Sequence, residues 1–373
     1  MSTPAPPLAA IPAEIASLAA YEERAALHMA ADAWAYLQEG TGDGITLAEN
    51  RAAFDRRRLL PRILADLRGG NTALELFGRT HEAPILLAPV AYQRLAHPEG
   101  ELATVRAAAA LGTGMVVSTL SSFTLEEIAE AARAASQELG VAAPPLWFQL
   151  YLQEDRAFSA ELVRRAEAAG YQALMLTVDA SIKRATLTLP PGVEAANLRG
   201  MPRLQQTADA GGRILFGTPL ANAAPRWSDL EWLRGLTSLP LILKGVMAAP
   251  DAVQALSLGV GGIVVSNHGG RVLDGVPSAL DVLPSIAEAT GGKAPLLLDG
   301  GIRRGTDVAK ALALGASAVM LGRPQIHALA VAGIAGIAHM LHLLRAELEL
   351  TMAQLGCPSV FDIGPDKLFT RRQ

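Results

Sequence analysis

Residues 295–323 read PLLLDGGIRRGTDVAKALALGASAVMLGR. Two short apolar runs, at 295–301 and 317–323, flank a helical pattern that follows a glycine-rich loop. A nearly continuous apolar run is typical of a parallel strand that is buried on both faces. A helix between two such runs indicates a strand–helix–strand unit in which the helix packs on the sheet.

The same alternation begins at residue 84 and gives eight strand–helix units in one series. The six other predicted strands are 84–91, 114–119, 146–151, 173–179, 240–246 and 261–267. A doubly wound open sheet uses the same alternation, but eight consecutive units favour closure. The sequence therefore predicts an α/β fold, namely a (β/α)8 TIM barrel.

The segments outside this repeat are expected to cover the barrel, so that residues 1–373 form a single domain. The expected parts are an N-terminal helical cap (1–83), the eight units (84–325), a lid loop after the fourth strand (180–226), and a last helix with the tail (326–373). The lid is predicted because so long a connection without periodicity is usually functional. Three histidines interrupt the apolar stretch 326–344, which favours a buried helix over a transmembrane segment.

The composition excludes several classes of protein. Half of the 373 residues are hydrophobic, and the mean hydropathy is +0.27, so the chain is not disordered. A formal net charge of −4 argues against nucleic acid as a partner. The single cysteine, Cys357, excludes a disulfide framework, and the spacing of acidic and histidine residues indicates no metal site. Because the first residues do not resemble a signal peptide, we expect a cytoplasmic protein.

Nearly all polar side chains of the predicted strands lie at or just after the strand ends. In a TIM barrel this end carries the active site. The side chains and glycines at these ends are Ala91, Ser121, Gln149, Tyr151, Thr177, Asp179, Lys244, His268, Arg271, Asp299, Gly301, Arg303, Gly322 and Arg323. This asymmetry predicts an active site where the strands end.

The segment 266–275, SNHGGRVLDG, suggests acid–base chemistry beside a carboxylate. His268 suits a general base because its pKa lies near neutrality, and Arg271 can hold a carboxylate through two hydrogen bonds. Asp179, at the end of LTVD, can orient the histidine. The alternatives are structural: His268 satisfies the loop backbone, Arg271 pairs with Asp274, and Asp179 caps a turn.

Two glycine-rich loops, in 296–307 and 320–324, follow the seventh and eighth strands. In this fold such loops commonly bind phosphate, and Arg303 and Arg323 add positive charge, although paired glycines also make simple tight turns. Lys244 could stabilise a reduced flavin, form a Schiff base, or only contact solvent. Gln149 and Thr177 suit the polar edge of a flavin, which favours flavin mononucleotide (FMN) over pyridoxal phosphate.

Several of these motifs together resemble the FMN-dependent L-2-hydroxy acid oxidase/dehydrogenase family, which includes glycolate oxidase, lactate oxidase, lactate monooxygenase and mandelate dehydrogenase. The motifs are APVAYQRLAHPEGE (88–101), WFQLY (147–151), LTVD (176–179), LILKGV (241–246), SNHGGR (266–271) and DGGIRRG (299–305). The resemblance covers nearly the whole chain, and the first motif is most similar to the hydroxymandelate oxidase branch.

The resemblance implies a role for each matched residue. His268 matches the catalytic base, Asp179 its partner, and Tyr151 a tyrosine that hydrogen-bonds the substrate. Tyr36 and Arg271 match the ligands of the substrate carboxylate. The residues that match flavin contacts are Ala91, Ser121, Gln149, Thr177 and Lys244. Those that match the ribityl and phosphate site are Asp299, Gly301, Arg303, Gly322 and Arg323.

Two departures from the family pattern lie on the substrate side. After LTVD the family carries a segment with two arginines, whereas this chain reads ASIKRATLTLPPG, in which only Arg184 could help to bind the carboxylate. Phe123 stands where a tryptophan is common. The cofactor side has no such departure.

The resemblance therefore implies oxidation of an L-2-hydroxy acid to the 2-oxo acid, with O2 re-oxidising the flavin to give H2O2. The proton that His268 takes comes from Cα or from the hydroxyl. Alternatives are a lactate- or mandelate-type dehydrogenase that reduces a quinone or a protein, and a lactate 2-monooxygenase-like enzyme. A flavin-dependent isomerase and a binding protein without turnover are further alternatives. The resemblance implies a homotetramer, and the sequence itself predicts no transmembrane segment.

Overall fold

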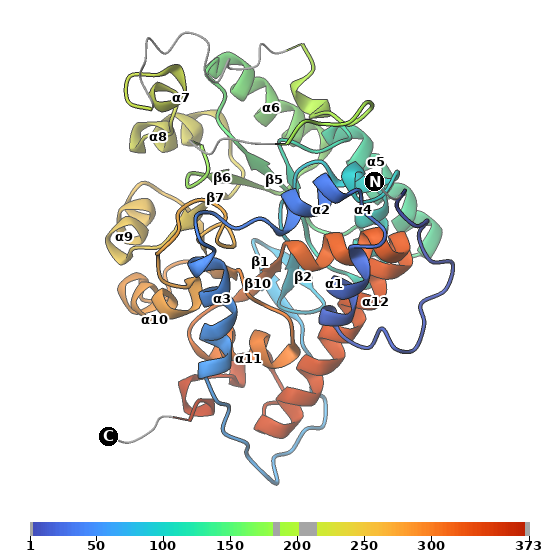
Figure 1. The fold of residues 1–373 in the computed structure, drawn as a ribbon. Helices are drawn as coiled ribbons and strands as arrows, with labels where there is room; N and C mark the ends of the chain where they lie inside the picture. Colours follow the sequence, from blue (N-terminus) through green and yellow to red (C-terminus); the bar gives the residue numbers. More distant parts are fainter. Residues whose placement is uncertain (1–2, 182–186, 201–214, 370–373) are drawn as a thin grey trace.

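The computed structural model describes residues 3–181, 187–200 and 215–369 (Figure 1). Eight parallel strands form a closed barrel in the order β10-β3-β4-β5-β6-β7-β8-β9. They are β3 (Ile85–Leu87), β4 (Met115–Ser118), β5 (Leu146–Leu150), β6 (Ala173–Thr177), β7 (Leu241–Val246), β8 (Gly262–Val265), β9 (Leu296–Asp299) and β10 (Ala318–Leu321). The predicted TIM barrel is confirmed, and each strand lies inside its predicted apolar run.

Burial explains why these strands read as unbroken apolar runs. Every residue of the eight strands is buried except Gly245, because side chains fill the barrel inside and helices cover it outside. The covering helices are α4 (Gly100–Leu111), α5 (Leu125–Leu139), α6 (Arg156–Ala169), α8 (Trp227–Leu236), α9 (Ala249–Ser257), α10 (Ala279–Thr290), α11 (Gly305–Ala313) and α12 (Arg323–Leu355).

α12 begins at Arg323, three residues before the predicted last helix, and it is two helical pieces joined at a break. Ala332 and Gly333 have non-helical backbone angles, and the N–H of Leu8 donates to the carbonyl of Val331 beside the break (2.7 Å). By length and composition α12 could cross a membrane, but 67% of its most apolar window is buried in the molecule. The core helix of a soluble protein passes the same test.

The N-terminal segment contains three helices, α1 (Leu18–Ala25), α2 (Ala31–Gln38) and α3 (Ile45–Arg56). Figure 1 shows α1 beside α12 and α3 beside α10. The expected all-helical cap over residues 1–83 is wrong in one place, because β1 (Leu74–Leu76) and β2 (Arg79–His81) form an antiparallel hairpin. In LELFGRTH, Leu74 and Leu76 are buried around an exposed Glu75, which is the alternation of a half-buried strand.

This hairpin closes the end of the barrel at which the strands begin. The Phe77 ring lies 5.4 Å from that of Trp147, near the start of β5, and it also packs against Gly262 at the start of β8. The ring of His81 packs against Gly114, just before β4. The opposite end of the barrel, where the strands end, is therefore the one open to a site.

The shorter elements lie in the connections and the tail. They are η1 (Gln93–Leu95), η2 (Ala196–Leu198), α7 (Pro219–Asn222), η3 (Val360–Asp362) and η4 (Pro365–Lys367). Of the connection 180–226, the structure describes 180–181, 187–200 and 215–226. Its function as a lid stays a prediction.

Candidate active site

His268 and Asp179 come together at the carboxyl end of the barrel, 89 residues apart in sequence. Nδ1 of His268 lies 3.0 Å from Oδ1 of Asp179, which leaves Nε2 of the ring to face a substrate. The backbone N–H of His268 donates to Ser266 Oγ (3.0 Å). His268 has a φ of 55°, in the left-handed region that costs a non-glycine residue about 1–3 kcal/mol. Such strain is typical of functional positions.

The surroundings favour the neutral form of this histidine and the charged form of its partner. Burial lowers the pKa of His268, nearby Lys244 lowers it further, and Asp179 opposes both without cancelling them. Burial alone would raise the pKa of Asp179, but His268 and Lys244 outweigh it, so that this pKa lies below its usual value. A neutral imidazole held by a carboxylate is the state that a general base requires.

Lys244 is a buried cation near the end of β7. Its Nζ lies 3.0 Å from Oδ2 of Asp299, at the end of β9, and donates to Ser266 Oγ (3.0 Å). Burial lowers the pKa of Lys244, but Asp299 and Asp179 outweigh this effect, and the pKa is raised overall. Lys244 therefore stays charged inside the barrel, which argues against a Schiff-base lysine, because that role needs a neutral amine.

Gly245 makes room for Asp179. Its φ is 106°, and the pairing of β7 with β8 shifts register between Lys244 and Val246, as at a β-bulge. A Cβ atom at position 245 would lie 2.6 Å from the Cβ of Asp179. Only glycine therefore fits beside this carboxylate.

Four buried polar atoms of the predicted site residues have no hydrogen-bond partner among the described residues. They are Gln149 Nε2, Thr177 Oγ1, Asp179 Oδ2 and Asp299 Oδ1. The amide of Gln149 is oriented because its Oε1 accepts from Ser118 Oγ and from the N–H of Thr119. Leaving buried polar groups unpaired costs about 1–3 kcal/mol each, so these atoms point to a polar ligand.

Ser121 and Ala91, which are also predicted to contact the flavin, lie on loops after the strands. Ser121 is fully buried, and its hydroxyl donates to the carbonyl of Phe123 (2.7 Å) and accepts from Asn197 Nδ2 (2.9 Å). Its hydrogen is thus already used within the protein. Ala91, four residues after β3, offers only its methyl group and its backbone. Contact of these two residues with a ligand stays a prediction.

Three arginines, Arg271, Arg303 and Arg323, follow β8, β9 and β10. Burial lowers the pKa of Arg323 to about 9, and repulsion from Arg271 and Arg303 contributes to this shift. A guanidinium keeps its proton in proteins, so Arg323 is a partly buried cation near two further arginines. This part of the site suits an anion such as a phosphate or a carboxylate.

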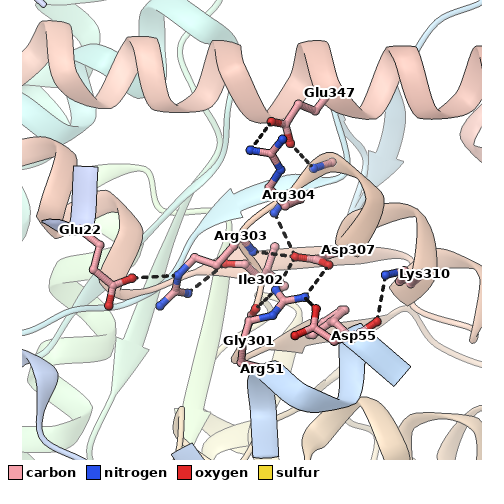
Figure 2. Close-up of polar contacts among 12 residues, drawn as sticks. Glu22, Arg51, Asp55, Gly301, Ile302, Arg303, Arg304, Asp307, Lys310 and Glu347 are labelled. Carbon is pink, nitrogen blue, oxygen red and sulfur yellow. Dashed lines mark hydrogen bonds and ion pairs between the residues drawn. The ribbon is translucent and has the colours of Figure 1, made fainter. Parts of the chain in front are cut away.

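Two of these arginines already have partners within the protein. Arg323 donates to the carbonyls of Leu37, Glu39 and Gly269 at 2.9–3.1 Å. Arg303 pairs with Glu22 of α1 (3.2 Å), and Figure 2 shows its side chain extended toward that residue. Gly322 directly precedes α12, so a phosphate here would also meet the N-terminus of a helix.

Buried Asp307 holds the loop between β9 and α11 (Figure 2). It accepts from the backbone N–H groups of Arg303 (2.9 Å) and Arg304 (3.0 Å), and it pairs with Arg51 of α3 (2.6 Å). Arg51 also donates to the carbonyl of Gly301 (2.7 Å). The loop predicted to bind phosphate is therefore fixed in position before any ligand binds.

The predicted carboxylate ligands lie together. The guanidinium carbon of Arg271 is 5.0 Å from the centre of the Tyr36 ring, and its Nη1 donates to the carbonyls of Leu37 (2.7 Å) and Glu39 (3.1 Å). The hydrogen bonds among the described residues leave Nη2 for a substrate. Asp274 instead accepts from backbone N–H groups, so the alternative pairing of Arg271 with Asp274 is not observed.

Tyr151 completes this side of the site. Burial raises the pKa of its hydroxyl, and Asp179 and Tyr36 raise it further, so the phenol stays protonated as a hydrogen-bond donor. A cavity of about 490 Å3 opens beside Tyr36, lined by Asp32, Ala35, Tyr36, Glu39, Leu187 and Thr188. Arg184 lies in 182–186, outside the described residues, so its role stays a prediction.

Sequence reasoning missed three supporting groups. Ser266 Oγ accepts from both Lys244 and the N–H of His268, and its place before NHGG was the only signal. Asn50 and Asn267 exchange two amide hydrogen bonds of 2.9 Å, which join α3 to the His268 loop. The third is Glu101 in α4, which is buried.

The barrel, the polar side chains at its carboxyl end and the arginines on its loops fit a flavin-dependent oxidoreductase. Residues 25–370 match the family model described as FMN-dependent dehydrogenase. The chain therefore belongs to the FMN-dependent dehydrogenase family, and FMN is its cofactor, as the sequence predicted. Within the described residues, no group of three or more histidine, cysteine or acidic side chains is placed to hold a metal ion.

Similar proteins are known in sequence and structure. The chain is 48% identical to an L-lactate oxidase of Nostoc sp., over 92% of this chain and 95% of that protein. It is 41% identical to human 2-hydroxyacid oxidase 1, over 94% and 95%. A solved structure of mandelate oxidase with a difluorinated hydroxy acid has 41% identity and a TM-score of 0.83, covering 95% of this chain and 99% of that one.

The residues present fit FMN. The unpaired Gln149 and Thr177 atoms and the buried Lys244 cation match the polar edge of a flavin ring, which needs donors, an acceptor and a positive charge. Arg303, Arg323 and the start of α12 suit the phosphate. Both features lie where the strands of one barrel end.

Proposed function

We propose that this protein oxidises an L-2-hydroxy acid to the corresponding 2-oxo acid and passes the electrons to O2. In balance, the hydroxy acid loses two electrons and two protons, and O2 gains them to become H2O2. The single observation that carries the proposal is the His268–Asp179 pair, whose free Nε2 lies in the same buried cluster as Lys244. The names of the relatives, which are oxidases of hydroxy acids, support it.

Arg271 and Tyr36 bind the substrate carboxylate. The Nη2 of Arg271 and the hydroxyl of Tyr36 are the groups available to its oxygens, since Nη1 is engaged with backbone. A fixed carboxylate places the adjacent Cα–OH group within the barrel end, where Tyr151 donates a hydrogen bond to it. Because Arg271 is already held by α2, little side-chain entropy is lost on binding.

His268 Nε2 takes a proton from the substrate. Asp179 accepts the Nδ1–H hydrogen bond, which fixes the ring orientation and stabilises the imidazolium that forms. FMN, when bound, accepts the two electrons. Lys244, which keeps its charge in the barrel, would stabilise the negative charge of the reduced flavin.

O2 as the final acceptor is part of this proposal, as are H2O2 and the L configuration. The family resemblance supports O2, because Ala91 matches a small residue that faces the flavin in that family. Two results would replace this part of the proposal. One is a quinone or a protein as the acceptor, and the other is a monooxygenase-like reaction that yields no free H2O2.

Anaerobic mixing tests the proposal. Oxidised holoenzyme is mixed with glycolate, L-lactate, L-mandelate or a longer L-2-hydroxy acid, and loss of the flavin absorbance is followed; the D enantiomers serve as controls. We expect bleaching by L acids only, followed by rapid recovery of the absorbance and release of H2O2 when air is admitted. Absence of bleaching with every acid would exclude hydroxy acid oxidation, and slow recovery in air would exclude O2.

We also propose a cytoplasmic homotetramer without a transmembrane segment. The composition supports the cytoplasmic location, and the family resemblance supports the tetramer. Fractionation of cells and the mass of the purified holoenzyme in solution test these two statements.

A further inference from the structure

Glu101 is a buried carboxylate that the proposed reaction does not use. It lies in the first turn of α4 and is 1% exposed. Its Oε1 accepts from the backbone N–H of Gln93 (3.1 Å) and from that of Ser122 (3.0 Å). Oε2 is buried and has no hydrogen-bond partner within the part of the chain that the structure describes.

The two donors belong to different loops at the carboxyl end of the barrel. Gln93 follows β3, and Ser122 follows β4. The two loops also bond directly, because the N–H of Tyr92 donates to the carbonyl of Leu120 (3.0 Å) and the N–H of Arg94 donates to Ser122 Oγ (3.2 Å). Glu101 therefore lies where these two loops meet, although Gln93 and Ser122 are 29 residues apart in the sequence.

The backbone where the two loops meet includes strained positions. Tyr92 has a φ of 54°, in the left-handed region that is costly for a residue with a side chain. Gly100 also has a positive φ (42°), and a Cβ there would lie 3.1 Å from the backbone nitrogen of Arg94. The start of α4 is therefore pressed against the loop after β3, which brings Glu101 under it.

Burying this carboxylate is expensive. Burial raises the pKa of Glu101 to about 7, although its hydrogen bonds act in the opposite direction. An apolar side chain of similar size would fill the space without that desolvation cost. What an apolar side chain cannot do is accept hydrogen bonds from both loops.

We propose that Glu101 is a positioning residue for FMN, because it joins the loops after β3 and β4 and so holds Ala91 and Ser121 in place for the flavin. The inference rests on the predicted contacts of these two residues with FMN. It concerns the affinity for the cofactor and does not depend on the substrate.

Binding of FMN to the apoprotein tests this role, measured by quenching of FMN fluorescence in the absence of substrate. We expect Glu101→Leu to raise the Kd for FMN tenfold or more, because it removes the shared acceptor. Glu101→Gln keeps an acceptor oxygen, and we expect it to stay within threefold of the wild type. The visible circular dichroism of the bound flavin should change in Glu101→Leu and not in Glu101→Gln.

Three controls make the test decisive. Thr290→Val removes a buried hydrogen bond in α10, away from both loops, and should leave the Kd within twofold. Ala91→Val tests the loop contact itself and should raise the Kd. Should Glu101→Leu not fold, Glu101→Ala is measured in its place, with the same expectation.

Two results would overturn the proposal. One is a Kd for Glu101→Leu or Glu101→Ala within twofold of the wild type. The other is an equal loss in Glu101→Gln, since charge and not the acceptor would then be the cause. An unchanged Kd in Ala91→Val would remove the premise that this loop touches FMN. A failure of hydroxy acid oxidation would leave all these values unaffected.

Discussion

The two ends of the barrel are built from different chemistry. Where the strands begin, a hairpin closes the barrel with Phe77, whose ring contacts Trp147 and Gly262. Where they end, Lys244 and Asp299 form a buried ion pair beside the His268–Asp179 pair. One end carries apolar contacts between rings, and the other carries charges and unpaired polar atoms.

Charge, more than polarity, separates the two ends. The closed end also contains unpaired polar atoms, because neither ring nitrogen of His81 has a partner in the described chain and the indole N–H of Trp147 has none either. Burial lowers the pKa of His81 to about 4, so this ring stays neutral at physiological pH. Neutral groups can be buried at moderate cost, whereas a buried charge is costly unless it is paired and hydrogen-bonded.

Removing the base should give the largest effect. We expect His268→Ala to slow flavin reduction by an L-2-hydroxy acid about 10³-fold, within the range for loss of a general base. FMN should stay bound, since the variant leaves the cofactor contacts in place. Stopped-flow absorbance of the holoenzyme measures the rate.

In the wild type the rate should fall at low pH, with a midpoint below 6.5, because burial lowers the pKa of His268.

An exposed histidine provides the matched control for this variant. His342→Ala, on the surface of α12, should reduce flavin at the wild-type rate. A His268→Ala protein that also did so would show that the proton goes elsewhere.

Gly245→Ala should disturb the His268–Asp179 pair without changing the side chain of either residue. The added Cβ would lie 2.6 Å from Asp179, so the carboxylate must move. A displacement of about 1 Å at a catalytic group can cost about 10²-fold, and we expect that loss in the rate of flavin reduction. Gly261→Ala adds a methyl group at the start of β8, where the nearest heavy atom is 3.7 Å away, and should leave the rate unchanged. Equal rates in the two variants would contradict the steric argument.

A substitution at the closed end should affect stability and spare the chemistry. Phe77 is only partly buried, so we expect Phe77→Ala to lower the free energy of unfolding by about 2–3 kcal/mol, less than for a fully buried ring. Urea unfolding of the apoprotein gives this value. Anaerobic flavin reduction below the unfolding transition should be unchanged. A large loss of rate with little loss of stability would reverse the assignment of the two ends.

Much of this contrast could be predicted from the sequence, because strand periodicity and strand ends are local signals. Closure of a parallel barrel brings all strand ends together, so the sequence could place Asp179 near His268, and the two side chains do lie 3.0 Å apart. The hairpin at 74–81 was missed because three-residue strands give too short an alternation. Ser266 and Glu101 could not be assigned, because their roles depend on how closely separate loops approach.

Glu101 differs from Asp179 and Asp299, because it is buried and has no ion pair with a cation among the described residues. Burial raises its pKa from 4.5 to about 7 in the folded chain. Between these pH values the unfolded chain loses the proton while the folded chain keeps it. The free energy of unfolding should therefore fall as pH rises from about 4.5 to about 7, and this contribution should be absent above that range.

Glu101→Gln does not titrate, so the difference in unfolding free energy between wild type and variant isolates this residue. We expect the wild type to lose about 3 kcal/mol relative to Glu101→Gln between pH 4.5 and 7.5, since one pKa unit corresponds to about 1.4 kcal/mol. Urea unfolding of both apoproteins across this range provides the measurement, with the exposed Glu138→Gln as the matched control. A constant difference would mean that the two backbone N–H groups keep the carboxylate charged, as they would if hydrogen bonding outweighed burial. The carboxyl end of the barrel would then hold Glu101 as it holds Asp179, as a stable anion.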